Sequence, residues 1–301
     1  MDKNFNHLYI KARAKINLAL DITGKRDDGY HEISTIMQSI ELCDGIYLKK
    51  VYKPNYLKLV STAKWLPTNE RNLAYQAANY LKKRFNIDEG VFINIEKNIP
   101  SSAGLGGGSA DCAATLVGMR NLFNLPLTNK DLAELSVQFG ADVPFCIIKG
   151  CAHAKGIGEI LRPIHSLPNM YIVLIKPGIF VSTAEIFKEL NLTKLGKRPD
   201  IERMIYALKH KDIKGIALSM GNVLESVTTR KHPIIAEIKD FLMNKGAFAA
   251  MMTGSGSTVF GLFVSPQNAY KAANAAKKAY PDFREIFITK PRPNPWPPRP
   301  Y

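Results

Sequence analysis

Four glycines stand close together ahead of an alanine-rich run in residues 99–116, IPSSAGLGGGSADCAATL: Gly104, Gly106, Gly107 and Gly108. Glycine has no Cβ, so backbone N–H groups at such positions can approach an anion that a side chain would keep away. The start of a helix adds unpaired N–H donors and the positive end of the helix dipole. Backbone of this kind is suited to binding the phosphate groups of a nucleotide.

Ser109 follows the glycines and is expected to be the N-cap residue of the helix, with a hydroxyl that could instead meet phosphate or magnesium. The common nucleotide motifs do not fit. The Gly-Lys pairs at 24–25 and 196–197 are each followed by Arg, whereas a Walker loop has Ser or Thr there. Ser109 also stands where a dinucleotide-binding loop has its third glycine. By itself, the segment leaves two interpretations open: phosphate binding, or a tight turn with close helix packing.

Two pairs of polar residues near the start of the chain are candidates for binding or catalysis. Lys15 and Asn17 lie two residues apart in a strand-like run, so both side chains project from one face. Tyr30 and His31 follow in the segment DGYH, where the ring could stack and the imidazole could form a hydrogen bond. Each pair also has a structural interpretation, with Lys15 as a solvated strand residue and Tyr30 as an aromatic residue at a rim.

Asp142 and a glycine-serine turn complete the candidates. Asp142 is a lone acid among small and apolar neighbours in GADVPF, where it is either a functional acid or only a cap or turn residue. The turn at residues 254–257, Gly-Ser-Gly-Ser, separates two apolar runs, as in a simple β-hairpin. Neither segment alone decides between these interpretations.

The apolar pattern predicts helices and strands in irregular order. Alternation predicts strands at 8–22, as one long strand or two paired ones, and at 90–99, while helical spacing predicts helices at 71–85 and 110–122. In the second half we expect a strand at 171–175, helices within 183–245, two strands around the glycine-serine turn, a helix at 268–279 and a strand at 285–289. Without regular βαβ alternation, the predicted fold class is α+β in two domains, residues 1–160 and 161–290.

The C-terminal residues 291–301 are expected to form a separate tail. The last twelve residues, KPRPNPWPPRPY, contain six prolines and therefore few backbone hydrogen-bond donors. Such a segment is typical of an extended, polyproline-like and disordered tail, and we assign it no function.

The composition limits the possible partners and the compartment. The chain of 301 residues has 41 Lys and Arg against 26 Asp and Glu, a formal charge of +15 that favours anionic partners. No aromatic-basic RNA motif accompanies this charge, so we expect neither nucleic acid nor a membrane as a partner. Four scattered cysteines predict reduced thiols and no metal among them. Without a signal peptide or a run of about 20 apolar residues, the chain is expected to be cytoplasmic.

Together and in this order, the segments resemble those of the GHMP kinases, the superfamily of galactokinase, homoserine kinase and mevalonate kinase. Within it the match is closest to the family of 4-diphosphocytidyl-2-C-methyl-D-erythritol kinases, which act in the non-mevalonate isoprenoid pathway. The resemblance covers about Lys11 to Thr289 and depends on AKINLALDITGKRDDGYHEI, PSSAGLGGGSADCAA, GADVPF, GIGEIL, KPGIFVSTAEIF, GNVLESV and TGSGSTVFGLF. It implies a two-domain fold: an N-terminal ATP-binding domain and a ferredoxin-like C-terminal domain, with the active site in the cleft between them.

The resemblance also implies a reaction and its catalytic residues. ATP would phosphorylate the 2-hydroxyl of 4-diphosphocytidyl-2-C-methyl-D-erythritol, and Asp142 would take the proton of that hydroxyl. Lys15 would keep Asp142 ionised, orient the hydroxyl and offset the developing negative charge. The expected partners are these two small molecules, with Mg²⁺ as the metal, and the chain is expected to be a monomer or a homodimer.

The binding residues implied by the resemblance form three groups. The ATP site would comprise Asn72, Lys97, Pro100, Ser101, Ser102, Ala103, Gly104, Leu105, Gly106, Gly107, Gly108, Ser109 and Ala110, with Ser109 near magnesium. The cytidyl substrate would be bound by Tyr30 and Phe187 on either side of the cytosine, by His31 and Asn17 through hydrogen bonds, and by Thr183 at the border. The third family motif would comprise Gly254, Ser255, Gly256, Ser257 and Thr258.

Two alternatives stay open at this point. A sister kinase of the mevalonate or homoserine type would keep the ATP loop but would not need the cytosine set of Tyr30, His31 and Phe187. A non-catalytic sugar or nucleotide sensor on the same fold would tolerate the loss of Lys15 or Asp142, and both residues are present.

Overall fold

The computed structural model describes residues 6–295, and the chain divides into two compact units. The first comprises the chain up to Ala14, Leu42–Ser101 and Gly106–Ile148, and the second comprises Lys15–Glu41, Ser102–Leu105 and the chain from Lys149 onward. Strands β1 (His7–Lys25) and β2 (His31–Val51) are 19 and 21 residues long and contribute to both units. The units therefore differ from the consecutive domains 1–160 and 161–290 expected from the sequence.

The sheet of the first unit contains parts of β1 and β2 together with β3 (Leu57–Ser61) and β4 (Gly90–Glu96). Strand β4 lies between β2, to which it is antiparallel, and β3, to which it is parallel. Val91, Ile93 and Ile95 of β4 are fully buried, which confirms the alternation predicted for this strand.

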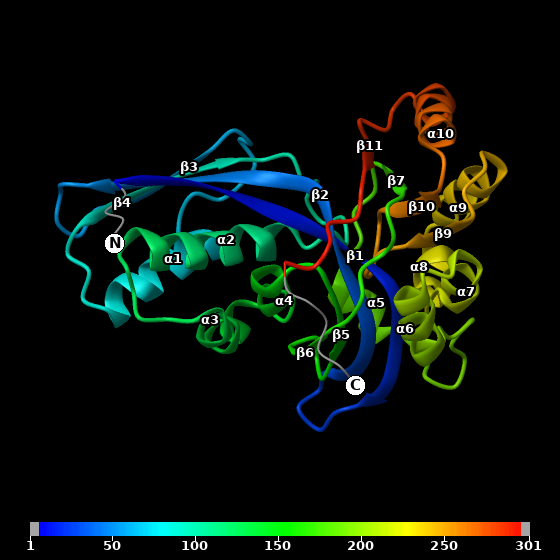
Figure 1. Cartoon of the computed structure of the whole chain (residues 1–301), viewed down its shortest axis with the longest axis horizontal. Helices are drawn as coiled ribbons and strands as arrows, with labels where there is room; N and C mark the ends of the chain where they lie inside the picture. Colours follow the sequence, from blue (N-terminus) through cyan, green and yellow to red (C-terminus); the bar gives the residue numbers. More distant parts are fainter. Residues whose placement is uncertain (1–5, 296–301) are drawn as a thin grey trace. The chain divides into compact units, whose positions relative to one another are not determined.

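Two helices, α1 (Leu73–Arg84) and α2 (Gly107–Leu122), lie side by side on this sheet (Figure 1). At Gly118 of α2, a Cβ would lie 2.0 Å from Leu48 Cδ1 of β2, so the missing side chain lets helix and sheet approach closely. The unit is completed by α3 (Asn129–Ser136), a 3-10 turn (Val137–Phe139) and α4 (Val143–Ile148).

In the second unit, short strands extend the β1–β2 pair. Strand β5 (Cys151–Lys155) pairs with β2 over Thr35–Gln38 and with β6 (Ile160–Pro163). Strand β8 (Gly221–Asn222) pairs in parallel with β1 at Ala19 and Leu20, close in sequence to the predicted site residues of β1.

A separate antiparallel sheet in the second unit has the strand order β11-β7-β10-β9, from β7 (Tyr171–Lys176), β9 (Ala249–Met252), β10 (Val259–Phe263) and β11 (Glu285–Thr289). Helices α9 (Ile234–Asn244) and α10 (Pro266–Ala279) pack on it (Figure 1). The remaining helices lie between β7 and β9 in the chain: α5 (Thr183–Lys188), α6 (Ile201–His210), α7 (Ile213–Ser219) and α8 (Glu225–Lys231). Helices connect β7 to β9 and β10 to β11, and the four strands lie in the order β11-β7-β10-β9. This is a ferredoxin-like arrangement, as expected.

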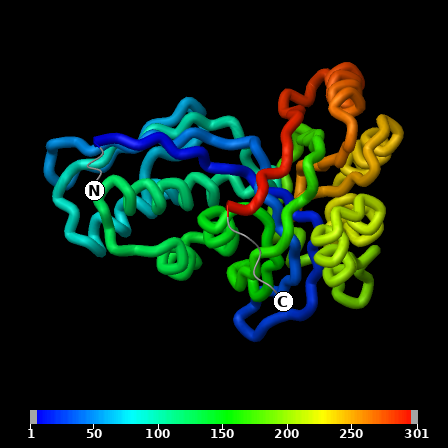
Figure 2. Tube along the Cα trace, viewed as in Figure 1, coloured from blue at the N-terminus to red at the C-terminus, as the bar shows by residue number. Residues whose placement is uncertain are grey.

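The segment after β11 is bound to the second unit. Pro291 forms a β-bridge with Ile40, and Gln38 Nε2 donates to the carbonyl of Arg292 at 2.8 Å. Asn294 Nδ2 donates to the carbonyl of Ile164 at 2.5 Å. Figure 2 shows this end of the chain, in red, running beside the blue strands. Residues 291, 292 and 294 are thus held by hydrogen bonds, which differs from the disordered tail expected there, and residues 296–301 lie outside the described part.

All four cysteines are free thiols, and burial raises the pKa of Cys112 and Cys151. Between residues 6 and 295, none of the helices combines the length and the apolar character needed to cross a bilayer.

Candidate active site

The glycines of the predicted phosphate loop serve different purposes. Gly104 and Gly106 have φ angles of 71° and 68°, in the left-handed region that favours glycine. At Gly104 a Cβ would also lie 2.1 Å from the carbonyl oxygen of Thr253, so the backbone excludes any side chain. Gly108 is exposed, and the atom nearest to its Cβ position is Leu73 Cδ1, 4.0 Å away. Close backbone contacts therefore explain the glycine at 104, whereas packing does not require a glycine at 108.

The N-cap of α2 is Gly106, and the prediction that Ser109 caps this helix is wrong. Ser109 is the third residue of the helix, and the first intrahelical bond runs from the Ala110 N–H to the Gly106 carbonyl at 2.8 Å. A glycine cap has no side-chain oxygen, and N–H groups in a first helical turn have no intrahelical acceptor. The N–H groups of Gly107, Gly108 and Ser109 can therefore bind an anion.

Lys97 belongs to a buried ionic cluster beneath this helix start. Its ammonium pairs with Asp44 and, at 2.9 Å, with Asp111 of α2. The other oxygen of Asp44 accepts the N–H groups of Asn98 and Ile99, at 2.5 and 2.7 Å. A Cβ at Gly107 would lie 3.1 Å from Lys97 Nζ. The cluster thus fixes the chain that leads into the glycine loop. The Lys97 ammonium, which was predicted to lie near the nucleotide, forms ion pairs with two carboxylates.

The charges in this cluster are unequal, since two carboxylates face one ammonium. Burial raises the pKa of Asp111, although Lys97 opposes the shift. Burial lowers the pKa of Lys97, but attraction to Asp111 and Asp44 outweighs it and leaves that pKa above its usual value. Asp111 Oδ1 is buried and has no hydrogen-bond partner among the described residues. A proton on this carboxyl would balance the cluster.

Sequence reasoning missed Asp44 and Asp111. Their common signal is an acid inside a largely apolar run, LCDGIYL for Asp44 and ADCAATL for Asp111. A charged residue at such a position is buried only with a partner.

Asn72 was also predicted for the ATP site, although it lies outside the glycine loop. It is the N-cap of α1: its Oδ1 accepts the Ala74 N–H at 2.9 Å, and its Nδ2 donates to the Pro67 carbonyl at 2.7 Å.

Asp142 precedes α4 in the first unit and is half-buried. Its carbonyl accepts the N–H of Cys146 at 3.1 Å, and the N–H of Val143 donates to the carbonyl of Gly140 at 3.1 Å. The backbone of Asp142 thus begins the helix. These bonds fix the backbone that carries the Asp142 side chain.

Lys15 and Asn17 of β1 lie in the second unit and contact each other, as their spacing predicts. Lys15 Nζ donates to Asn17 Oδ1 at 2.8 Å, and the two residues are 4% and 2% exposed, so Lys15 is not a solvated strand residue. Asn17 Nδ2 donates to Thr35 Oγ1 at 2.8 Å. The Lys15 N–H donates to the carbonyl of Leu105 at 3.0 Å, which joins the strand to part of the glycine loop.

The third motif is the turn between β9 and β10, and it packs on the same part of the loop. Thr253 Oγ1 accepts the N–H of Asn17 at 3.0 Å and donates to the carbonyl of Gly104 at 3.2 Å. A Cβ at Gly254 would lie 3.3 Å from Gly104 Cα. The predicted hairpin is confirmed, and within the second unit the structure brings together β1, residues 102–105 and the turn.

Two predicted substrate residues, His31 and Phe187, form a ring pair with centroids 5.3 Å apart. The pKa of His31 is lowered by burial and by the charge of Lys25. Tyr30 is 61% exposed, so the aromatic neighbour of Phe187 is His31. Thr183 Oγ1 lies 2.7 Å from Ser255 Oγ, which places the start of α5 beside the third motif.

Among the residues described, no group of three or more His, Cys, Asp or Glu side chains could hold a metal ion. Mg²⁺ commonly binds proteins through few side-chain ligands and the phosphates of a nucleotide. The hydroxyl of Ser109, in the first turn of α2, is of the type that can supply one of these few side-chain ligands to Mg²⁺.

Two family models match the chain, the GHMP kinases N terminal domain over residues 72–150 and the GHMP kinases C terminal domain over residues 204–282. The chain belongs to the GHMP kinases. The N-terminal match spans the glycine loop and Asp142, and the C-terminal match contains the third motif. GHMP kinases use ATP as co-substrate, so the chain is a phosphotransferase with an alcohol group of a small molecule as acceptor.

Curated relatives match the sequence of this GHMP kinase over nearly its whole length. The chain is 48% identical to the 4-diphosphocytidyl-2-C-methyl-D-erythritol kinase of Alkaliphilus metalliredigens, covering 92% of this chain and 93% of the relative. It is 48% identical to the enzyme of that name from Caldicellulosiruptor bescii, with 93% and 96% covered.

Solved structures show the same fold. A crystal structure of 4-(cytidine 5'-diphospho)-2C-methyl-D-erythritol kinase superimposes with a TM-score of 0.80 at 31% identity, covering 94% of this chain and 99% of that one. A homoserine kinase from Cytophaga hutchinsonii shares the fold with a TM-score of 0.76 at 18% identity, covering 97% and 98%. The two-domain GHMP kinase fold expected from the sequence is thereby confirmed.

Proposed function

We propose that this GHMP kinase transfers the γ-phosphate of ATP to the 2-hydroxyl of 4-diphosphocytidyl-2-C-methyl-D-erythritol. The observation that carries the proposal is the 48% identity, over more than nine-tenths of both chains, to kinases named for that substrate. The homoserine and mevalonate kinases share the fold at 18% identity or less, so they support the fold alone.

Asp142 is proposed as the general base. As the 2-hydroxyl attacks the γ-phosphorus, a carboxylate oxygen of Asp142 accepts its proton, the new P–O bond forms and ADP leaves. The fixed start of α4 supports this role, because a base works only when it is held within hydrogen-bond reach of the proton.

Lys15 is proposed as the cation that orients the hydroxyl and offsets the developing charge. Its burial supports this role, since electrostatic interactions strengthen where water is excluded. The contact with Asn17 Oδ1 holds the ammonium at a defined place on β1.

The glycine loop is proposed to bind the triphosphate through the first N–H groups of α2. Mg²⁺ would be held by Ser109 and the phosphates, and would neutralise the phosphate charge that repels the incoming oxygen. Asp44, Asp111 and Lys97 support the loop from beneath, where they fix the chain at residues 97–99.

The substrate assignment is tested by measuring ADP release with three alcohols. We expect turnover with 4-diphosphocytidyl-2-C-methyl-D-erythritol and none above background with mevalonate or homoserine. Comparable turnover of either simple alcohol would reject the cytidyl specificity, and turnover of none would favour a non-catalytic sensor.

Gly108→Ala and Gly104→Ala separate the two purposes of the glycines. We expect Gly108→Ala to leave stability within about 1 kcal/mol of wild type, because its Cβ has space and alanine favours helix. Its KM for ATP should rise roughly tenfold, the scale of one lost hydrogen bond to a charged group. Gly104→Ala should instead cost about 1–3 kcal/mol, because its Cβ meets backbone. Urea unfolding and ATP titration measure both, and an unchanged KM in Gly108→Ala would remove this residue from the phosphate site.

Tyr30→Ala and Phe187→Ala are each expected to weaken binding of the cytidyl substrate by about 1–3 kcal/mol, the scale of stacking a base on an aromatic ring. The KM for ATP should stay unchanged. Tyr270→Ala, at an exposed tyrosine of α10, is the matched control and should behave as wild type. Equal weakening of both substrates would show that these rings do not bind the cytosine.

A further inference from the structure

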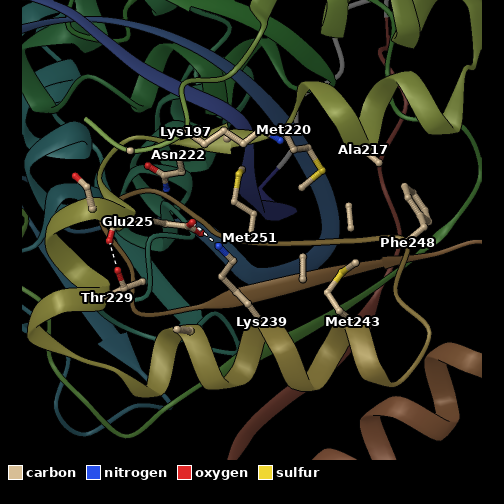
Figure 3. Close-up of a pocket in the computed structure, with 16 residues that line it drawn as sticks. Lys197, Ala217, Met220, Asn222, Glu225, Thr229, Lys239, Met243, Phe248 and Met251 are labelled. Carbon is tan, nitrogen blue, oxygen red and sulfur yellow. Dashed lines mark hydrogen bonds and ion pairs between the residues drawn. The ribbon is translucent and has the colours of Figure 1, made fainter. Parts of the chain in front are cut away.

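A pocket of about 510 Å³ lies in the second unit, and none of the site residues predicted from the sequence lines it. It is open to solvent and is lined by residues of α7, β8, α8, α9 and β9, together with Gly196, Lys197 and Phe248 (Figure 3). Two of its lining residues, Asn222 and Glu225, come from GNVLESV, a segment that matches the family pattern and has no role in the proposed mechanism. The volume is in the range of sites for small molecules.

The lining has an apolar part and a polar part. Met220, Met243, Phe248 and Met251 are the large apolar residues of the lining, and in Figure 3 the sulfur atoms of Met220 and Met251 face the open space. Flexible, polarisable methionines adapt to ligands of irregular shape. The pocket therefore fits a molecule with an apolar body.

The polar part carries one excess positive charge. Lys239 Nζ pairs with Glu225 Oε2 at 2.5 Å, so these charges balance. Lys197 is exposed, and its Nζ donates to the carbonyl of Leu218 at 3.3 Å, a neutral acceptor. A ligand with a single anionic group would complement this lining, whereas a cation would face two ammonium groups.

The polar wall of the pocket also holds the third motif. Asn222 Nδ2 donates to the carbonyls of Met252 and Gly254, at 2.9 and 2.8 Å. Glu225 Oε1 accepts the N–H of Met252 at 2.7 Å, while its other oxygen pairs with Lys239. An anion that attracts Lys239 would weaken its pair with Glu225, and Glu225 in turn holds the strand that enters the turn at residues 254–258.

We propose that this pocket is a regulatory site for a small amphipathic molecule with an apolar body and one anionic group. Its binding displaces Lys239 from Glu225, shifts the turn at residues 254–258 and slows phosphoryl transfer. The binding half of the proposal is independent of the identity of the alcohol substrate, so it can fail or succeed separately from the proposed function.

The binding test uses 8-anilino-1-naphthalenesulfonate, an amphipathic monoanion, and N-phenyl-1-naphthylamine, its analogue without the sulfonate. In fluorescence titrations of the full chain we expect saturable binding of the anion that excess ATP does not displace. Ala217→Phe, which fills the pocket from α7, should weaken binding at least tenfold, and Lys239→Gln should weaken it severalfold. Ala279→Phe and Lys278→Gln on α10, at exposed positions, are matched controls.

Three binding results would overturn the site: displacement by ATP, equal binding by Ala217→Phe, or equal affinity for the uncharged analogue. The regulatory half is tested by ADP release. A saturating concentration of the anionic probe should lower kcat at least twofold in wild type and have no effect in Ala217→Phe, whose kcat without probe should equal that of wild type. Binding without any change in kcat would overturn the regulatory role.

Discussion

Asp142→Asn is expected to lower kcat by a factor of at least several hundred, the usual scale for loss of a positioned general base. Asparagine keeps the size of the side chain and the backbone that begins α4, but its amide cannot accept the proton of the attacking hydroxyl. Binding of ATP should remain within about twofold of wild type, because the proposed role concerns the alcohol and not the phosphates.

Single-turnover kinetics and an equilibrium titration with a nucleotide analogue measure the two quantities separately. Asp88→Asn, at an exposed position of the first unit, is the matched control and should turn over normally. Near-normal kcat in Asp142→Asn would rule out Asp142 as the base, and a large loss of nucleotide affinity would indicate a role in binding instead.

Lys15→Met is expected to lower kcat roughly 10²- to 10³-fold, the scale of removing one group that stabilises charge in the transition state. Methionine has a similar length and suits the buried position, so the fold should tolerate it. The cost in stability is about 1 kcal/mol, the scale of one lost hydrogen bond, because Asn17 Oδ1 loses the Lys15 donor while Thr253 Oγ1 still lies 3.3 Å from it. Lys11→Met, at an exposed position of the same strand, controls for the loss of one positive charge.

A double-mutant cycle tests whether Lys15 and Asp142 serve the same step. If they do, the double variant should lose little more activity than the worse single variant, because residues that act as a unit are strongly non-additive. Losses that multiply would indicate independent roles and would contradict the proposed pairing.

Local patterns in the sequence were sufficient for much of the second unit. The strand predicted at 285–289 is β11, and the pair of strands around Gly254–Ser257 is β9 and β10. The helix predicted at 268–279 begins only two residues earlier, at Pro266. These elements are short, bounded by turn residues and regular in their apolar period, so neighbouring residues determine them.

The elements that depend on distant partners were harder to predict. The strand predicted at residues 8–22 as one long strand or two is the single 19-residue β1, but β2, with 21 residues, was not predicted. Strand β2 pairs with β4 at one end and with β5 at the other, so each half has a different environment. Likewise, Asn294 fixes residues near the C-terminus through bonds to Ile164 and Ser166, which proline content could not indicate.

By itself, the sequence determined the glycine-rich helix start and the shared face of Lys15 and Asn17, because these depend on residue type and spacing along one element. The family and the ferredoxin-like unit were predicted through the resemblance of several motifs in their order along the chain. The tertiary structure alone decided which glycines serve packing, that Lys97 is bound by Asp44 and Asp111, and that Asn222 and Glu225 hold the third motif beside a second pocket. The physical reason is that a buried charge or amide takes whichever partner the fold brings within about 3 Å, and chain spacing does not encode that partner.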